Sequence, residues 1–152
     1  MDIGSYLSGF ADGEGSFCIC FSPSQRHAFG WEIRPSFSVS QKRERAEVLQ
    51  LFRDFLGCGT LRNSRRDGTI KYEVRSISDL VGKVIPHFDR YPLLSGKRQE
   101  FEIFSTICRR MMRGEHLTRD SFKELVELAF GMNFNGNRRY TKEEIFKTLR
   151  ER

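Results

Sequence analysis

The sequence predicts an α+β fold in which helices and β-hairpins follow the order αββαββα, with further helices at the C-terminus. Two observations lead to this prediction. Apolar residues recur at helical spacing in some segments and at every second position in others, and the alternating segments come in pairs around turn-rich loops. Because paired hairpins form an antiparallel sheet with one apolar face, the helices are expected to cover that face.

The chain of 152 residues is expected to form one domain, since no linker divides it and this length buries a sizeable core. The αββαββα unit is expected over about residues 3–112, and a helical extension over about residues 113–152. The domain is therefore taken to span residues 1–152.

The first predicted helix covers residues 3 to about 14, where apolar residues form one helical stripe that a Gly-rich segment ends. A hairpin follows, because apolar and polar residues alternate in "SFCICFS" and in "WEIRPSFSVS", which flank the loop "PSQRHAFG". Helical spacing returns after Arg43 and ends at Gly57, which suits a C-cap.

A second hairpin is expected where "GTLRNS" and "TIKYEVRS" flank the turn "RRDG". Helical spacing resumes at Leu80, and Pro86 is expected to kink or stop this helix. A further helix is expected through Phe101 and Met111.

Two short helices are expected in the C-terminal part, with Thr118 and Thr141 as their N-caps. Thr141 is expected to form a capping box with Glu144. The segment "GMNFNGNRRY" between these helices is a loop by composition.

The charge balance favours a polyanionic partner, because Lys and Arg number 26 against 20 Asp and Glu and give a net charge of +6. A basic surface that serves only solubility is the alternative. The aromatic residues, chiefly 14 Phe, fall mostly at core spacing, so stacking on single-stranded nucleic acid is not the favoured binding mode.

The cysteines and histidines do not predict a metal or disulfide framework. The four cysteines include no CxxC pair and the three histidines lie far apart, so free thiols in a reducing compartment are expected. No apolar run approaches the roughly 20 residues of a membrane span, and the N-terminus lacks a secretory pattern. We therefore expect an intracellular protein, in the cytoplasm of a prokaryote or in an organelle.

Two acidic residues, Asp12 and Glu14, stand where the first helix ends. A helix C-terminus carries roughly half a negative charge, so acids there are misplaced by several tenths of a kcal/mol unless a cation is near. Magnesium suits carboxylate and carbonyl oxygens and binds phosphate oxygens in the same coordination sphere. The pattern points to phosphodiester hydrolysis, and the alternative is a pair of solvated acids at a helix end.

Ser5, Gly9 and Gly13 are spaced i, i+4, i+8 and form a ridge with almost no side chain along one face of this helix. A glycine inside a helix costs about 1 kcal/mol against alanine, so close approach by another helix is the expected compensation. If that helix belongs to a second copy of the chain, two-fold symmetry brings the two Glu14 carboxylates nearly face to face. A homodimer interface is therefore expected over Ser5, Gly9, Asp12 and Gly13.

The segment Leu7–Gly15, "LSGFADGEG", resembles the signature of the LAGLIDADG homing endonucleases, an intron- or intein-encoded family of DNA-cleaving enzymes. The resemblance covers roughly residues 3–112 and implies a saddle-shaped antiparallel sheet. The remaining C-terminal helices are expected either to buttress this sheet or to contact the DNA backbone. It also implies that Glu14 is the essential metal ligand, that the Gly13 carbonyl assists, and that Asp12 is structural at the helix junction. The implied metal is Mg²⁺, with Mn²⁺ as a substitute and Ca²⁺ as an ion that binds without supporting cleavage.

Single-motif members of this family act as homodimers on nearly palindromic DNA. The resemblance therefore implies Mg²⁺-dependent cleavage of both strands of a long duplex target. Two other functions stay open on the same scaffold: an RNA-binding maturase that assists intron splicing, and a DNA-binding regulator that does not cleave.

The cleavage centre is expected to contain three further residues. The resemblance implies that Gln41, at the end of the second strand, and Lys97, near the start of a later helix, position water and stabilise the scissile phosphate. Lys97 opposes the positive end of its helix, which is more easily explained if an anion binds there. Arg45 is the third candidate, with Arg43 as the alternative. The intact set of Glu14, Gln41 and Lys97 argues against the non-cleaving regulator.

The polar faces of the two hairpins are the expected DNA-reading surface, because a β-ribbon fits the major groove and each base pair presents a distinct hydrogen-bonding pattern there. On the first hairpin these residues are Cys18, Cys20, Ser22, Glu32, Arg34, Ser36 and Ser38. On the second hairpin they are Arg62, Ser64, Lys71, Glu73 and Arg75. Contacts to phosphates are expected from the turn and loop residues Arg65, Arg66, Arg138 and Arg139.

Overall fold

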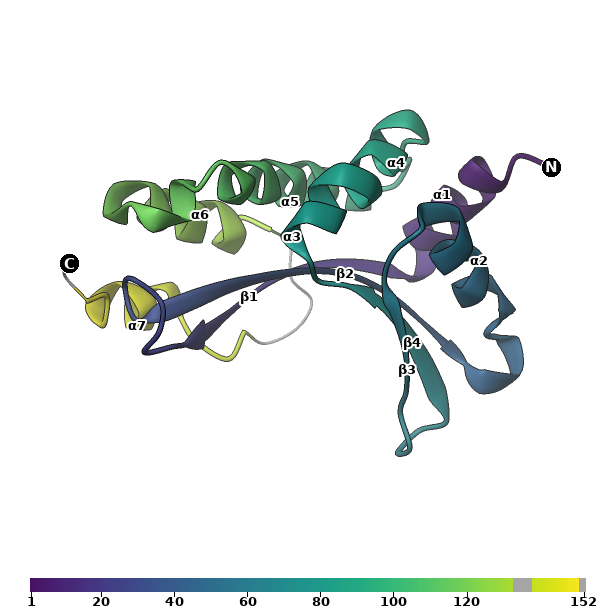
Figure 1. Cartoon of the computed structure of the whole chain (residues 1–152), viewed down its shortest axis with the longest axis horizontal. Helices are drawn as coiled ribbons and strands as arrows, with labels where there is room; N and C mark the ends of the chain where they lie inside the picture. Colours follow the sequence, from purple (N-terminus) through teal and green to yellow (C-terminus); the bar gives the residue numbers. More distant parts are fainter. Residues whose placement is uncertain (133–137, 151–152) are drawn as a thin grey trace.

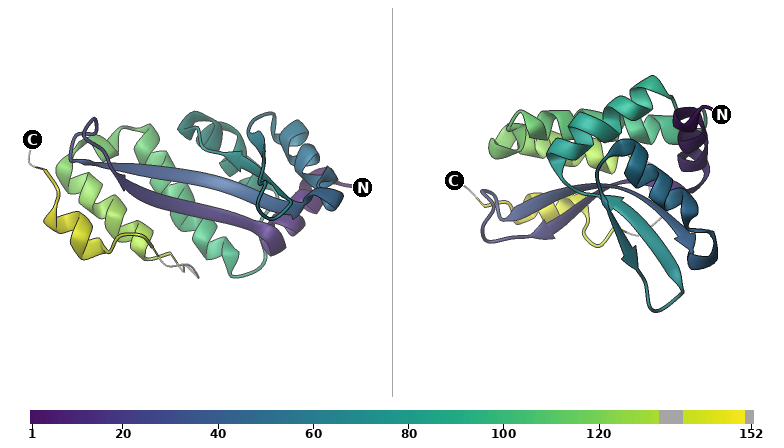
Figure 2. Two further views of the ribbon diagram at one scale, coloured as in Figure 1. Left: turned by 90° about the horizontal axis from the view of Figure 1, so that it is seen from below. Right: turned by 45° about the vertical axis from the view of Figure 1, so that its right-hand side comes forward.

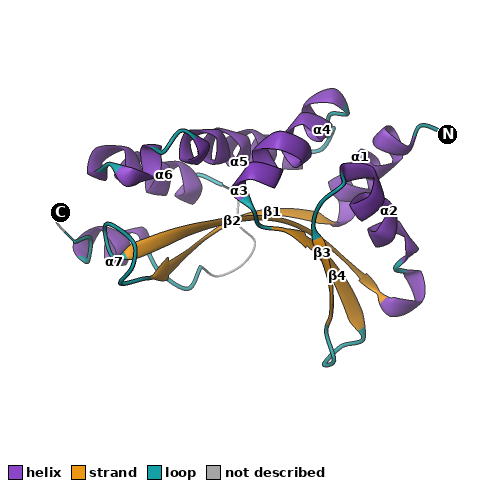
Figure 3. Ribbon diagram, in the orientation of Figure 1, coloured by secondary structure: helices purple, strands orange, loops and turns teal. Residues whose placement is uncertain are grey.

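The computed structural model describes residues 1–132 and 138–150 and contains one four-stranded sheet. Its strands are β1 (Gly15–Pro23), β2 (Trp31–Lys42), β3 (Thr60–Asn63) and β4 (Thr69–Val74), in the spatial order β1-β2-β4-β3 and all antiparallel to their neighbours. Figures 1 and 3 show most of the helices gathered on one side of the sheet. The predicted α+β class and the αββαββα order are therefore confirmed.

Helix α1 (Ile3–Glu14) begins at Asp2, whose side chain accepts a hydrogen bond from the Ser5 backbone N–H. It buries Leu7 and Ala11 and runs directly into β1. Strands β1 and β2 form a long hairpin whose register pairs Gly15 with Val39 at one end and Pro23 with Trp31 at the other. The direct passage from α1 into β1 places the end of the helix at the edge of the sheet.

A short 3₁₀ turn η1 (Arg43–Arg45) and helix α2 (Glu47–Leu56) connect the two hairpins. Gly57 ends α2 with a φ of 72°, a left-handed conformation that glycine adopts without strain, and its N–H bonds to the Arg53 carbonyl. The predicted C-cap is therefore confirmed.

Of the two outcomes expected at Pro86, a kink or a stop, the stop is wrong. The chain is helical from α3 (Ile77–Asp79) through a π-helical turn η2 (Leu80–Val84) into α4 (Ile85–Arg90). Proline has no N–H and its ring crowds the carbonyl four residues earlier. The wide π-turn lies directly before Pro86, with the Ile85 N–H bonded to the Leu80 carbonyl, and this arrangement admits the proline within the helix.

The C-terminal part contains α5 (Lys97–Met112), the 3₁₀ turn η3 (Glu115–Leu117), α6 (Arg119–Phe130) and α7 (Lys142–Lys147). Thr141 caps α7 as predicted, since its hydroxyl accepts a hydrogen bond from the Glu144 N–H at 3.0 Å. Thr118 occupies the N-cap position of α6, but its side chain makes no capping hydrogen bond. The loop predicted over residues 131–140 falls partly on residues 133–137, which lie outside the described residues.

Aromatic rings fill the space between the sheet and its helices. The Phe17 ring centroid of β1 lies 5.1 Å from that of Phe37 in β2, 5.4 Å from Phe88 in α4 and 5.2 Å from Phe104 in α5. These four rings join two strands to two helices, so the expectation that most phenylalanines belong to the core is confirmed. These rings do not pack on the polar face of the sheet.

A buried polar contact fastens α1 to α4. The Ser8 hydroxyl donates to the Tyr91 carbonyl at 2.6 Å, and His87 Nε2 lies 3.0 Å from the same oxygen. Because the Ser8 proton is used by Tyr91, His87 Nε2–H is the donor of the second bond. Burial lowers the pKa of His87 to about 4, so the imidazole is neutral at physiological pH.

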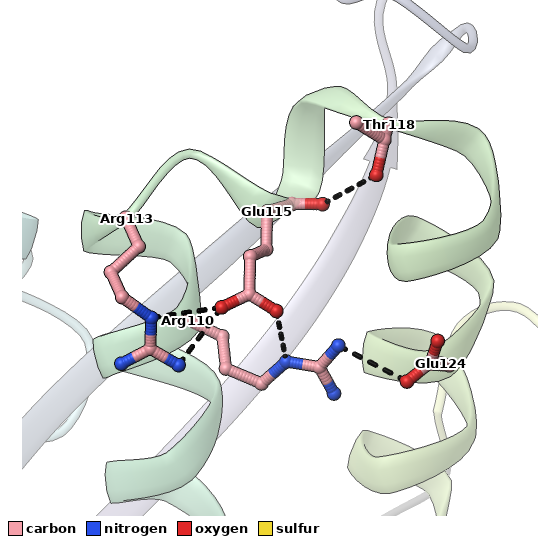
Figure 4. A network of polar contacts seen from close by, with 5 residues as sticks. All are labelled: Arg110, Arg113, Glu115, Thr118 and Glu124. Atoms are coloured by element: carbon pink, nitrogen blue, oxygen red, sulfur yellow. Dashed lines mark hydrogen bonds and ion pairs between the residues drawn. The ribbon is translucent and has the colours of Figure 1, made fainter.

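The C-terminal helices are tied to the core by charges and hydrogen bonds. Figure 4 shows Arg110 of α5 between Glu115 of η3 and Glu124 of α6, with Arg113 on the second oxygen of Glu115. At the same end of the molecule, where Trp31 and His116 line one pocket, Trp31 Nε1 donates to the Thr148 hydroxyl at 3.0 Å. In Figure 1, α7 accordingly lies at the end of the β1–β2 hairpin.

None of the helices in the described part of the chain combines the length and the apolar character that crossing a bilayer requires.

Candidate active site and nucleic-acid interface

The end of α1 presents Glu14 to solvent and holds Asp12 in a network. Glu14 is the last residue of the helix and is exposed, whereas Asp12 is partly buried. The Asp12 carboxylate accepts hydrogen bonds from the Leu94 N–H at 3.0 Å, the Ser95 N–H at 3.0 Å and the Ser95 hydroxyl. Partial burial alone would raise the pKa of Asp12, but these hydrogen bonds hold it below its ordinary value. Asp12 therefore fastens the segment before α5 to α1, as expected of a structural residue at this junction.

Lys97 reaches the same end of α1 from the first position of α5. Its Nζ donates to the Ala11 carbonyl at 3.1 Å and to the Gly15 carbonyl at 2.5 Å. These carbonyls lie at the negative end of the helix dipole, which an ammonium stabilises. These two contacts explain the position of Lys97 without the bound anion that the sequence suggested at the start of its helix. The structure instead brings Lys97 close to the helix end that carries Glu14.

Gln41 and Arg45 lie at the same end of the sheet. Val39 is opposite Gly15 in the register, so Gln41 extends two residues past the start of β1. Gln41 alternates in phase with buried Val39 and is opposite Ile70, which places it on the helix-covered side of β2. Arg45 follows in η1 and is exposed. Lys97 thus contacts the backbone at the end of the helix that carries Glu14, and Gln41 and Arg45 are placed at the adjoining strand end.

A metal at the end of α1 would find few protein ligands, and these are oxygen atoms. Among the described residues there is no group of three or more His, Cys, Asp or Glu side chains that could hold a metal ion. Glu14 offers one exposed carboxylate, and Gly13 leaves the space around its Cα open. Magnesium is commonly bound by one or two carboxylates together with substrate phosphates and waters. The donor set fits such an ion if a second carboxylate or a phosphate completes the site.

The side of the sheet away from most helices carries the predicted DNA-reading residues of the first hairpin. The register places Cys18 opposite Ser36, Cys20 opposite Arg34, and Ser22 opposite Glu32, all out of phase with the buried residues of both strands. The left view of Figure 2 looks onto this side of the sheet, with most of the helices behind the strands. We call this surface the open sheet face; on the first hairpin it comprises Cys18, Cys20, Ser22, Glu32, Arg34, Ser36 and Ser38.

On the second hairpin, the open sheet face carries a cluster of three charged residues, Arg62, Lys71 and Glu73. Arg62 of β3 is opposite Lys71 of β4. Both contact Glu73, at 2.5 Å and 3.4 Å, and Glu73 is only 8% exposed. Burial would raise the pKa of Glu73, but Arg62 and Lys71 lower it overall, so the carboxylate is charged and paired.

Several placements on this hairpin differ from the prediction. Ser64 and Arg75 follow β3 and β4 rather than lying within them. The register also places five residues outside the predicted set on this face: Ser16, Ser40 and Lys42 of the first hairpin, and Thr60 and Thr69 of the second. The alternation itself was the signal that would have found them.

The four arginines predicted to contact phosphates fall into two groups. Arg65 and Arg66 are exposed in the β3–β4 turn, and Arg139 is exposed near the start of α7. Arg138 is half-buried, and its guanidinium donates to the Ile19 carbonyl at 2.6 Å and the Ala129 carbonyl at 2.7 Å. These bonds join the C-terminal segment to β1 and α6, so the contacts of Arg138 argue for a structural role instead of a phosphate contact.

The predicted dimer face of α1 is open. A Cβ built at Gly9 or Gly13 meets nothing within 4 Å, whereas one at Gly4 meets the Tyr91 ring at 2.3 Å. Leu94, beside this face, is 87% exposed, and the surface between them is hollowed by a pocket of about 250 Å³. Sequence reasoning missed Leu94, because the pair Leu93–Leu94 after Pro92 gives no periodic signal that would tell the buried leucine from the exposed one. The small-residue ridge, the pocket and an exposed apolar side chain therefore lie together.

The family of the chain follows from its similarity to known proteins. The model of the family described as LAGLIDADG endonuclease matches residues 7–108, from within α1 to within α5. The chain belongs to the LAGLIDADG endonuclease family. The resemblance carried by Leu7–Gly15 is thus confirmed, and Glu14 occupies the end of the signature helix of that family.

The relatives of this LAGLIDADG chain include longer proteins and one of the same size. "Probable intron-encoded endonuclease 2" of Neurospora crassa is 28% identical over 148 residues, which are 97% of this chain but only 31% of that protein. The crystal structure of the homing endonuclease I-TnaI matches with a TM-score of 0.83 and 32% identity over 95% of this chain and 94% of that chain.

A DNA complex of I-SmaMI is a further neighbour. It was solved bound to an uncleaved DNA target in the presence of calcium ions, and it matches with a TM-score of 0.81 and 26% identity. The match covers 88% of this chain and 45% of that chain. The LAGLIDADG chain described here therefore corresponds to one half of I-SmaMI and to nearly the whole of I-TnaI.

Proposed function

We propose that this LAGLIDADG chain is a site-specific DNA endonuclease that hydrolyses phosphodiesters in both strands of a long, nearly palindromic duplex. The observation that carries the proposal is the position of Glu14, an exposed carboxylate where α1 enters edge strand β1, with Lys97 bonded to the carbonyl of the next residue, Gly15. The relatives support it, since one is named "Probable intron-encoded endonuclease 2" and another was solved on a DNA target. We propose that it acts in the cytoplasm of a prokaryote or in an organelle.

The open sheet face is proposed to lie in the major groove. Its hydroxyl, thiol and guanidinium groups donate and accept hydrogen bonds, and Arg34 can read guanine through two bonds. Glu73 is engaged by Arg62 and Lys71, so this trio presents mainly positive charge to the duplex. Exposed Arg65, Arg66 and Arg139 are proposed to bind phosphates, which anchor the protein without reading sequence.

Glu14 and the Gly13 carbonyl are proposed to hold a divalent cation, with Mg²⁺ as the natural ion. When bound, this ion supplies the positive charge that phosphodiester hydrolysis requires in its transition state. A calcium-containing DNA complex of a relative is consistent with a divalent site in this fold. Lys97 orients the end of α1 through two carbonyls and adds positive charge near the scissile phosphate. Gln41 and Arg45 are proposed to orient the attacking water and the phosphate.

The protein is proposed to act as a homodimer. One chain supplies one Glu14, and the described residues add no further carboxylate cluster around it. The open ridge of Gly9 and Gly13 permits close contact with the same helix of a second copy, and two-fold symmetry then pairs the two Glu14 side chains. Exposed Leu94 and the adjoining pocket are suited to cover each other across the same axis.

A cleavage assay tests the function. The purified protein is incubated with a plasmid library of long duplex sites, with Mg²⁺ or with chelator, and double-strand breaks are sequenced. We expect breaks at one nearly palindromic site that require the metal and are lost in Glu14→Gln. The matched control is Glu143→Gln, an exposed acid in the first turn of α7, which should cut as the wild type does. Intact DNA together with accelerated splicing of intron RNA would instead favour the maturase.

A further inference from the structure

Cys18 and Cys20 form a thiol pair on the open sheet face. Residues i and i+2 of a strand point to the same side of a sheet, and the two Sγ atoms lie 3.0 Å apart. Cys20 is exposed and Cys18 is partly buried. The other two thiols lie elsewhere, Cys58 after α2 and Cys108 buried within α5.

The pair is within reach of a disulfide bond. Cα atoms two residues apart in a strand are separated by about 6.6 Å, near the upper end of the roughly 4.4–6.8 Å found in disulfides. The sulfur atoms need to approach by about 1 Å to form a bond of about 2.05 Å. A bond made near the geometric limit is strained and therefore easily reduced. The geometry suits reversible oxidation.

The surroundings of the pair make Cys20 the attacking thiol. Arg34 is directly opposite Cys20 across the hairpin. The hydrogen bond from Cys18, aided by the positive charges of Arg138, Arg34 and Lys71, lowers the pKa of Cys20 to about 6. The same hydrogen bond, together with burial, raises the pKa of Cys18. At neutral pH Cys20 is thus mainly a thiolate, the reactive form, and Cys18 keeps its proton.

We infer that Cys18 and Cys20 are a reversible dithiol–disulfide site on the DNA-binding face, oxidised by a small disulfide such as oxidised glutathione. The Cys20 thiolate attacks one sulfur of that disulfide, forms a mixed disulfide and releases the first glutathione thiolate. Cys18 then loses its proton and attacks the Cys20 sulfur, which forms the protein disulfide and releases the second glutathione thiolate. Two protein thiols are oxidised and one small disulfide is reduced, so the electrons balance.

Oxidation is expected to weaken DNA cleavage, a consequence that rests on the proposed function. The bond removes two thiol groups from the surface that reads bases and draws together two residues of β1 next to Arg34. Loss of the contacts to one base pair weakens specific binding about tenfold. We therefore expect about a tenfold lower rate of cleavage at subsaturating protein, restored by a reducing thiol.

Peptide mapping tests the site itself. The full protein is equilibrated in glutathione buffers of graded ratio at neutral pH, denatured, alkylated and digested with trypsin. Both cysteines fall in the peptide Met1–Arg26, whereas Cys58 and Cys108 fall in two other peptides. We expect Met1–Arg26 alone to escape alkylation and to lose two hydrogen atoms. Cys18→Ser should stop at a glutathione adduct on Cys20, and the matched control Cys58→Ser should behave as the wild type.

Two results would overturn the inference. One is a Met1–Arg26 peptide that stays alkylated at every glutathione ratio, and the other is a wild-type peptide that retains an unresolved glutathione. If the disulfide forms but the rate of DNA cleavage does not change, the proposed effect of oxidation on cleavage is wrong. These results differ from a failure of the proposed function, in which the fully reduced protein itself does not cut.

Discussion

At the residue scale, Lys97 was predictable as a candidate site residue, but its contacts were not. The signature at the end of the first helix and the lysine at a later helix start were both recognisable in the sequence. Their contact was not, because Lys97 bonds carbonyls 86 and 82 residues earlier in the chain. Arg138 shows the converse, since a basic residue in a loop that suggested phosphate binding lies instead against Phe130 and two backbone carbonyls.

We predict that Lys97→Met destabilises the protein by about 1–2 kcal/mol, because two charge-assisted hydrogen bonds at the end of α1 are lost. Equilibrium unfolding in urea measures this change. The matched control is Arg98→Met, whose partner Glu102 lies 3.5 Å away on an exposed helix face and should cost under about 0.5 kcal/mol. Equal losses in the two variants would show that the Lys97 contacts do not stabilise the helix end.

His87 predicts a loss of stability in mild acid. Its pKa is about 4 in the folded protein and about 6.5 in the unfolded chain, so only the unfolded chain binds a proton between these values. Stability should therefore be constant above about pH 6.5, fall by up to about 3 kcal/mol as the pH drops to about 4, and change no further through this group. Thermal or urea unfolding across this range measures the loss.

The matched control for this titration is His87→Gln, which keeps an N–H donor for Ser8 and removes the ionisable ring. Its stability should depend much less on pH, with the remaining slope due partly to His116, whose pKa burial also lowers. A wild type and a variant with the same pH profile would contradict a neutral, buried His87.

At the scale of elements, alternation and helical spacing predicted the strands and the helices that cover them, because these patterns record which face is buried. Gly57 could be assigned as a C-cap for the same local reason. The π-turn before Pro86 was not predictable, since a proline in a helical pattern is compatible with a stop, a kink or a widened turn, and packing decides among them. Leu94 was missed because its exposure depends on where α1 lies.

The docking of α6 on α5 supplies an element-scale prediction. Arg110 is 18% exposed and contacts Glu115 at 2.7 Å and Glu124 at 3.1 Å. Arg110→Met should lower the stability by about 1–2 kcal/mol, because a partly buried guanidinium with two partners is lost. Arg113→Met is the control, since Arg113 is 63% exposed and contacts only Glu115, and it should cost under about 1 kcal/mol. Urea unfolding compares the two, and a larger loss in Arg113→Met would refute the assignment.

At the scale of the whole molecule, the proposed cleavage of both strands requires two copies of the site that one chain contains. It presents one sheet with an open face and one exposed Glu14, and its α1 carries a ridge that nothing in the described chain covers. The match to one half of I-SmaMI is consistent with this division. The sequence indicated the ridge through its glycine spacing, but the contact proposed for it is with a second copy of the chain and cannot be derived from one chain alone.

The most direct test of the paired acids is the cleavage activity of protein separated by size, compared between two glycine variants. Gly9 and Gly82 are both helical, and a side chain added at either meets nothing within 4 Å of the chain itself. Gly9→Arg places a long charged side chain on the proposed interface, whereas Gly82→Arg does so on η2, away from it.

We predict that light scattering gives the mass of two chains for the wild type and Gly82→Arg, and that both cut DNA. Gly9→Arg should remain folded, run as a single chain and fail to cut. A wild-type protein that cuts both strands as a single chain, or a Gly9→Arg variant that still pairs and cuts, would contradict the account.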